Sequence, residues 1–269
     1  MLIPMPRDGE TSDFADLSGT QSRAVVIAEL RRLLPGREGS RQTLPFGLAA
    51  LDSCLPEGGL ACGALHEVVP EAQNTIAAAF GFIVALLAHI ACPPPLIFVM
   101  PAYGGRQHGR LFGHGLNGLG LDPGRLILIE TAHRKETLWA MAEALRSGAP
   151  HAVVGMIDRL DLKTSQKLHL AAADCGLPLL LMRPAQTLES SAAATRWRVG
   201  TRRAARDRFG LYARPRWHLQ LERCRNGRPG QWVVEYDHVA HCFSLAAALA
   251  DPALSRGPGA QPLQQAGRS

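Results

Sequence analysis

Short apolar runs alternate with longer amphipathic segments along most of this chain of 269 residues. The runs are rich in leucine, isoleucine and valine, which predicts buried parallel strands at Leu65–Val69, Leu96–Met100, Leu126–Ile129, His151–Asp158 and Leu177–Pro184. Apolar residues at helical spacing predict the intervening helices, at Thr75–Ala91, Lys135–Arg146 and Ser165–Asp174. This order predicts an α/β fold, with right-handed crossovers and a mostly parallel, twisted sheet flanked by helices.

The pattern changes after Pro184. Thr195–Val199 predicts a further strand, and Arg216–Asp237 alternates apolar and polar residues around Asn226-Gly227, which predicts an antiparallel hairpin. Two more helices are expected at Gln21–Leu34 and at Leu48–Leu51. The glycine-rich stretch between the second and third strands predicts a loop. The C-terminal part of the sheet should therefore be antiparallel.

Composition and the two ends of the chain set the expected domain boundaries. An apolar content of 46% supports one core, and we expect a disordered segment over 1–19, one globular domain over 20–250 and a flexible tail over 251–269. No run reaches the roughly 20 apolar residues of a membrane span. The N-terminus lacks the basic-then-apolar order of a secretory signal, so we expect a cytoplasmic protein with no membrane partner.

The segment between the first strand and its helix has the position of a phosphate-binding loop but not its chemistry. A working loop, G-x-x-x-x-G-K-[ST], needs glycines for inward N–H groups, a lysine for the outer phosphates and a hydroxyl for magnesium. Here neither glycine nor lysine is present, Asn74 or Thr75 stands at the cation position, and Glu71 adds a negative charge. The degenerate loop is represented by Val69, Pro70, Asn74, Thr75 and Ile76. We therefore expect no nucleotide cofactor and no catalysis.

Residues 196 to 228 carry 11 arginines against Asp207 and Glu222. Such density is typical of a surface that binds nucleic acid or an acidic partner, although arginine is also the default cation of a chain with three lysines. The candidate binding residues lie between a predicted loop and the hairpin: Arg196, Arg198, Arg202, Arg203, Arg206 and Arg208. The sequence leaves open whether the ligand is DNA or a protein.

Cysteine and histidine do not gather into a convincing metal site. The six cysteines are scattered without a CxxC pair, which favours reduced thiols. Asp237, His238, His241 and Cys242 have ligand-type side chains, but no second pair follows to complete a tetrahedron. We interpret them as a polar turn before another element, and expect no metal.

The order of elements resembles the RecA core and, within it, the ImuA family of SOS-mutagenesis accessory proteins. The resemblance covers about residues 20 to 245 and rests on "LPFGLAALDSCLPEGGLACGALHEVV" and "LGLDPGRLILIETAHRKETLWAMAEALRSGAPHAVVGMID". It implies a RecA-like core in which at most one of the three catalytic positions carries a suitable residue. The loop cation is missing, no acid stands near Pro101-Ala102, and Asp158 alone matches the strand-terminal aspartate.

The resemblance further implies a non-catalytic adaptor in SOS-induced error-prone translesion DNA synthesis. Its expected partners are an ImuB-type Y-family-like protein and an error-prone C-family DNA polymerase complex, with RecA and DNA as further candidates. Two alternatives stay open: a SulA-like cell-division inhibitor that binds FtsZ, and a divergent ATPase. The arginine-rich block favours the adaptor over the SulA-like protein, and the missing cation and base argue against the ATPase.

Overall fold

The computed structural model describes residues 42–89, 95–102, 109–204, 209 and 214–246. All of them belong to one compact unit. The predicted helix Gln21–Leu34 and the segments 1–19 and 251–269 lie outside the described residues.

Strands and helices alternate as the sequence predicts. The strands are β1 (Thr43–Leu44), β2 (Leu60–Ala61), β3 (Leu65–Pro70), β4 (Leu96–Pro101), β5 (Leu126–Thr131), β6 (Ala152–Met156), β7 (Leu179–Met182), β8 (Thr195–Arg202), β9 (Arg216–Cys224), β10 (Gly230–Asp237) and β11 (Cys242–Leu245). The α-helices are α2 (Ala49–Asp52), α3 (Ile76–His89), α5 (Gly113–Gly118), α6 (Arg134–Ser147) and α7 (Leu162–Cys175). Short 3-10 turns lie at Pro56–Gly58, Gln73–Thr75 and Pro123–Arg125.

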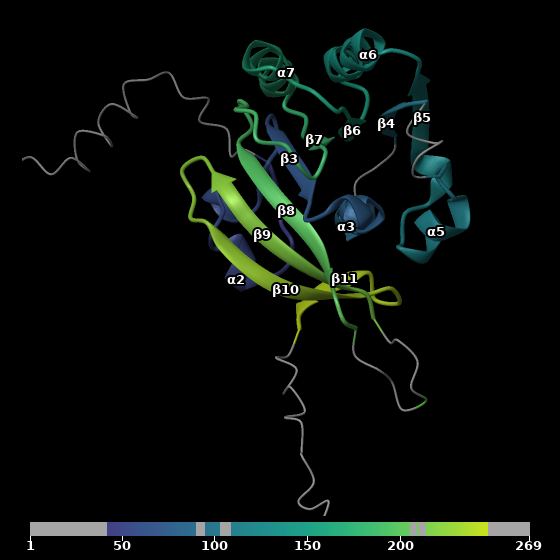
Figure 1. Cartoon of the computed structure of the whole chain (residues 1–269), viewed down its shortest axis with the longest axis vertical. Helices are drawn as coiled ribbons and strands as arrows, with labels where there is room; N and C mark the ends of the chain where they lie inside the picture. The colour runs from purple at the N-terminus through teal and green to yellow at the C-terminus, as the bar shows by residue number, and fades with distance from the viewer. Residues whose placement is uncertain (1–41, 90–94, 103–108, 205–208, 210–213, 247–269) are drawn as a thin grey trace, which may run out of the picture. The chain divides into compact units, whose positions relative to one another are not determined.

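One large sheet organises these elements (Figure 1). Its strand order is β11-β10-β9-β8-β3-β7-β6-β4-β5, and β1 pairs with β2 in a separate small sheet. The neighbours from β8 through β3 to β5 are parallel, whereas β8, β9, β10 and β11 pair antiparallel. The predicted fold class, a RecA-like core with an antiparallel C-terminal hairpin, is confirmed.

Helices cover both faces of the parallel part. Helix α3 is apolar around most of its circumference and packs with residues of β3, β7 and β8 in the larger core. Helices α6 and α7 pack against each other and bury a smaller core on the opposite face, together with Leu65, Val99 and Leu181. Gly148 and Gly176 end these two helices in the left-handed conformation, as predicted.

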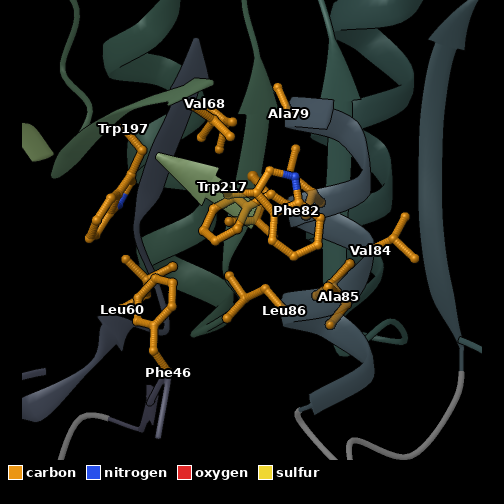
Figure 2. Close-up of a cluster of buried hydrophobic side chains, with 14 of the residues drawn as sticks. Phe46, Leu60, Val68, Ala79, Phe82, Val84, Ala85, Leu86, Trp197 and Trp217 are labelled. Carbon is orange, nitrogen blue, oxygen red and sulfur yellow. The ribbon is translucent and has the colours of Figure 1, made fainter. Parts of the chain in front are cut away.

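Aromatic side chains fill the larger core where β8 and β9 meet α3 (Figure 2). Phe46 lies 5.2 Å from Trp197 between ring centroids, and Phe82 lies 6.2 Å from Trp217 with the two rings edge to face. Offset and edge-to-face contacts of this kind add to the stabilisation that burial provides. The antiparallel strands are therefore fixed to the parallel core through one of their faces.

Four strands and α-helices of the described residues were not predicted: β1, β2, α5 and β11. Helix α5 forms within "GHGLNG", where the glycines favour a loop, and Leu116 anchors it in the larger core; the expectation of a loop throughout this stretch was wrong. Strand β11 adds to β10 after the polar turn, in which the Asp237 carboxylate accepts hydrogen bonds from the N–H groups of Val239 and Ala240. The prediction of a turn there is confirmed. None of the helices in the described part of the chain is long and apolar enough to cross a membrane.

Candidate functional site

The frame of a phosphate-binding site is retained at one edge of the sheet. Strands β3, β4 and β6 are parallel members of the same sheet, so their carboxyl ends open onto a common edge, which is where open α/β sheets bind ligands. The loop itself is shorter than predicted, because Val69 and Pro70 belong to β3 and Ile76 begins α3. Pro101-Ala102 ends β4, and the exposed Asp158 follows β6. The structure thus brings the three sequence positions to the same edge.

The loop after β3 closes on itself. The Thr75 hydroxyl accepts a hydrogen bond from the Ala72 N–H at 3.0 Å and donates one to the Ala72 carbonyl at 2.8 Å. Thr75 is buried, so this hydroxyl serves the turn that begins α3, and Asn74 beside it is exposed. Val69, Pro70 and Ile76 are buried as well. The loop is therefore built as a compact turn, and its only side-chain hydroxyl is already engaged.

A carboxylate lies at the end of β3, where a phosphate loop would need cations and N–H donors. The two oxygens of Glu71 accept hydrogen bonds from Arg202 at 2.8 and 3.1 Å, and His218 Nδ1 lies 3.4 Å from Oε1. Hydrogen bonding to Arg202 lowers the pKa of Glu71 below its usual value. The negative charge is therefore held in place at neutral pH.

Gly200 on β8 makes this arrangement possible. A Cβ at this position would lie 1.8 Å from Glu71 Oε2, so any side chain here would displace the carboxylate. The Glu71 N–H also donates to the Val199 carbonyl at 2.7 Å, which extends the pairing of β3 and β8 by one residue. Loop and strand are thus fitted to each other.

Alternation along β8 divides the predicted basic block between two environments. Trp197 and Val199 enter the larger core, whereas Arg196, Arg198 and Arg202 lie on the opposite face. Arg196 Nε pairs with Glu67 Oε2 at 2.7 Å, Arg198 pairs with Glu222, and Arg202 pairs with Glu71. These arginines hold carboxylates of the same sheet.

The centre of this network is buried. Glu67 on β3 is 0% exposed, and Arg183 beyond β7, 1% exposed, places Nε 3.9 Å from Glu67 Oε1. Burial lowers the pKa of Arg183 below its usual value, and Glu67 opposes that shift by favouring the charged guanidinium. Arg183 also pairs with Glu189, and Arg216 pairs with Glu235 directly opposite on β10. We refer to these ion pairs of Arg183, Arg196, Arg198, Arg202 and Arg216 as the charge ladder.

Arg203, one residue beyond β8, differs from the ladder arginines. It is exposed, and among the described residues its guanidinium forms no ion pair. Arg206 and Arg208 lie outside the described residues. The assignment of the six arginines to DNA or partner binding therefore stays a prediction. The ladder itself was not predicted, although the alternation in "RWRVGTR" indicates which arginines share a face.

Comparison with known proteins places the chain in a family. It is 33% identical over 225 residues to Protein ImuA of Caulobacter vibrioides, and the match covers 77% of this chain and 90% of the relative. The same identity and coverage are found in a second strain of that species. The chain belongs to the ImuA family. No protein-family model matches it.

Proposed function

We propose that this ImuA family member is a non-catalytic adaptor in SOS-induced error-prone translesion DNA synthesis, which docks onto an ImuB-type polymerase-like partner. Membership of the ImuA family supports a part in SOS mutagenesis. An error-prone C-family polymerase completes the proposed assembly, and RecA or DNA is a further candidate for contact.

The arrangement at the end of β3 carries the non-catalytic part of the proposal. Phosphoryl transfer depends on positioned cations and N–H donors around the outer phosphates. The loop instead holds the Glu71 carboxylate, charged because Arg202 and His218 surround it, and engages the Thr75 hydroxyl within its own turn. Beyond β4, Pro101-Ala102 supplies no acid to activate water. Arg202 is thus engaged by a carboxylate of the protein itself, and the loop does not offer it as a cation for an outer phosphate.

Binding is proposed to fall on the part of the basic block that is not tied into the sheet. Arg203 is exposed and forms no ion pair among the described residues, whereas Arg202 is paired with Glu71, and Arg196, 13% exposed, pairs with a buried carboxylate. An accessible guanidinium can approach a phosphate or a carboxylate without breaking a buried pair. By sequence, Arg206 and Arg208 extend the same segment.

ATP turnover by the purified full chain tests the non-catalytic part. We expect no turnover above background with or without single-stranded DNA. Turnover that disappears in Asp158→Ala would support the divergent ATPase instead.

A pull-down of the tagged full chain from cells with damaged DNA tests the adaptor part. We expect ImuB-type protein and C-family polymerase subunits to be recovered. The charge-reversed variant of Arg203 and Arg206 should recover less of these proteins, or bind DNA less, with nearly unchanged thermal stability. Recovery of FtsZ without polymerase subunits would favour the SulA-like alternative.

A further inference from the structure

A shallow hollow of ≈ 420 Å³ lies between α7, the segment before β8 and the end of β9. It is distinct from the degenerate loop, because it is lined by the flank of α7 and not by the carboxyl ends of β3 and β4. Its α7 wall consists of Leu162, Gln166, His169 and Leu170, which recur at the spacing of one helix face. We refer to this hollow as the α7 groove.

The α7 groove combines an apolar wall with cations. Leu162 is 47% exposed and Leu170 is 60% exposed, so two leucines present their side chains to solvent along one stripe. The opposite wall carries Arg223 and Arg225, and among the described residues neither guanidinium forms an ion pair. Lys163 and Lys167 are exposed on the solvent side of the same helix. The groove thus offers hydrophobic contact flanked by positive charge.

Hydrogen bonds tie the floor of the groove to both of its walls. The Ala192 N–H donates to Ser165 Oγ at 2.9 Å, which ties the segment before β8 to α7. Arg223 Nη1 donates to the Ser191 carbonyl at 2.7 Å, which ties the same segment to β9. Ser191, Ala192 and Ser165 are buried. A groove held in this way is preformed, so an occupant would not have to order it.

The backbone around the groove selects the conformation of the occupant. Strand β8 is already paired with β3 on one side and β9 on the other, so no free strand edge is offered there. An extended peptide would find no strand edge there to pair with, whereas a helix satisfies its own N–H and C=O groups internally. A helix could also lie along the stripe from Leu162 to Leu170 by ordinary side-chain interdigitation.

We propose that the α7 groove binds an amphipathic, acidic helix of a partner protein. Apolar residues of that helix contact Leu162 and Leu170, and its carboxylates face Arg223 and Arg225 on one side and Lys163 and Lys167 on the other. Charge complementarity selects an acidic occupant, since within the described residues these four cations are not neutralised by ion pairs. The exposed leucines disfavour nucleic acid, whose charged backbone gains nothing from them. This inference stands whether or not the partner is an ImuB-type protein.

A displayed library of randomised helical peptides of about 15 residues, selected on the full chain, tests the proposal. Peptides that also bind the double variant Leu170→Asp/Arg225→Glu are removed. We expect the enriched sequences to carry leucine-like residues at helical spacing and an excess of glutamate and aspartate. No enrichment, or enrichment of basic or non-amphipathic sequences, would overturn the proposal.

The best peptide, labelled and titrated by fluorescence anisotropy, locates the site. Leu170→Asp and Arg225→Glu should each weaken binding about tenfold or more. The control variants Leu188→Asp and Arg146→Glu change exposed residues that do not line the groove, and they should leave peptide binding unchanged. Equal loss in all four variants would contradict the assignment. If Leu170→Asp unfolds, the comparison of Arg225→Glu with Arg146→Glu decides. If DNA competes with the peptide in a way that depends on Arg225 but not on Leu170, the groove is a nucleic-acid surface. If Leu170→Asp abolishes self-association of the chain, the groove is a dimer contact. Either result would overturn the proposal.

Discussion

The two faces of β8, β9 and β10 are built from opposite chemistry on one backbone. One face presents Trp197, Trp217 and Tyr236 to the larger core. The other presents the charge ladder, in which Arg196, Arg198, Arg202 and Arg216 each pair with a glutamate. The apolar face joins the hairpin to the parallel core, and the ladder joins neighbouring strands on the other face through ion pairs.

Four arginines of the arginine-rich segment belong to the charge ladder. With Arg183 included, the ladder contains five arginines and five glutamates: Glu67, Glu71, Glu189, Glu222 and Glu235. Only Glu222 lies within residues 196 to 228, so a local count misses most of the balancing charge. The ladder is therefore neutral, and arginines outside it determine the charge available to a ligand.

Removing an aromatic ring from the apolar face should have the largest effect on stability. Trp217 is 4% exposed, and its ring lies near Phe82, Tyr236 and Phe243. Trp217→Ala should lower the free energy of unfolding by about 3–5 kcal/mol, through lost burial and the cavity left behind. Denaturant unfolding measures this, with Trp139→Ala, exposed on α6, as the control. A cost for Trp217→Ala no larger than for the control would mean that this face does not fix the hairpin.

Breaking the buried end of the ladder should cost about 3 kcal/mol or somewhat more. Arg196→Met removes the guanidinium that lies 2.7 Å from the fully buried Glu67 and leaves Arg183, at 3.9 Å, as the remaining partner. Adding Glu67→Gln should recover much of the loss, because a neutral amide costs less to bury than an unpaired carboxylate. Denaturant unfolding of both variants provides the test. If the double variant is no more stable than Arg196→Met, burial of the Glu67 charge is not what makes Arg196 important.

A polar chain inside the apolar face should make stability depend on pH. The His66 Nδ1 lies 2.8 Å from Thr195 Oγ1 and Nε2 lies 2.9 Å from the Ala61 carbonyl, while the Trp197 indole N–H donates to Thr195 Oγ1. A neutral imidazole satisfies this chain by donating from Nε2 and accepting the Thr195 hydroxyl proton. Burial lowers the pKa of His66 to about 4.

Since the folded state binds the His66 proton less readily than the unfolded chain, this contribution to stability is present above the ordinary pKa of 6.5 and is lost as the pH falls toward 4. The loss should approach about 3 kcal/mol at its upper limit. Denaturant unfolding across this range measures it, and His66→Gln should flatten the dependence in that window. An unchanged slope in His66→Gln would assign the acid sensitivity to other groups.

Much of the fold follows from the sequence, because buried parallel strands are continuous apolar runs and helices show apolar spacing. The strands around Phe98, Val154 and Leu181 were predicted in this way. The degenerate loop at Asn74 and Thr75 was predicted because the residue types that bind phosphate are absent from it. The partners of Arg196 and Arg202 could not be predicted, since Glu67 and Glu71 are about 130 residues distant and are brought near by the pairing of β3 with β8. Sequence indicates composition and alternation, whereas strand order decides which charges cancel.

The smallest effect on stability is expected for Arg203, and it separates the ladder from the proposed binding surface. Arg203→Ala removes an exposed cation that forms no ion pair within the described residues, so the free energy of unfolding should change by no more than about 0.5 kcal/mol. If this arginine contacts DNA, the salt dependence of DNA binding should decrease by about one charge, independent of DNA sequence. Filter binding at several salt concentrations measures this slope. A reduced slope with unchanged stability would assign binding to arginines outside the ladder. An unchanged slope, with a decrease in Arg198→Ala instead, would mean that ladder arginines leave their glutamates to bind the ligand, and the two sets of arginines would then not be distinct.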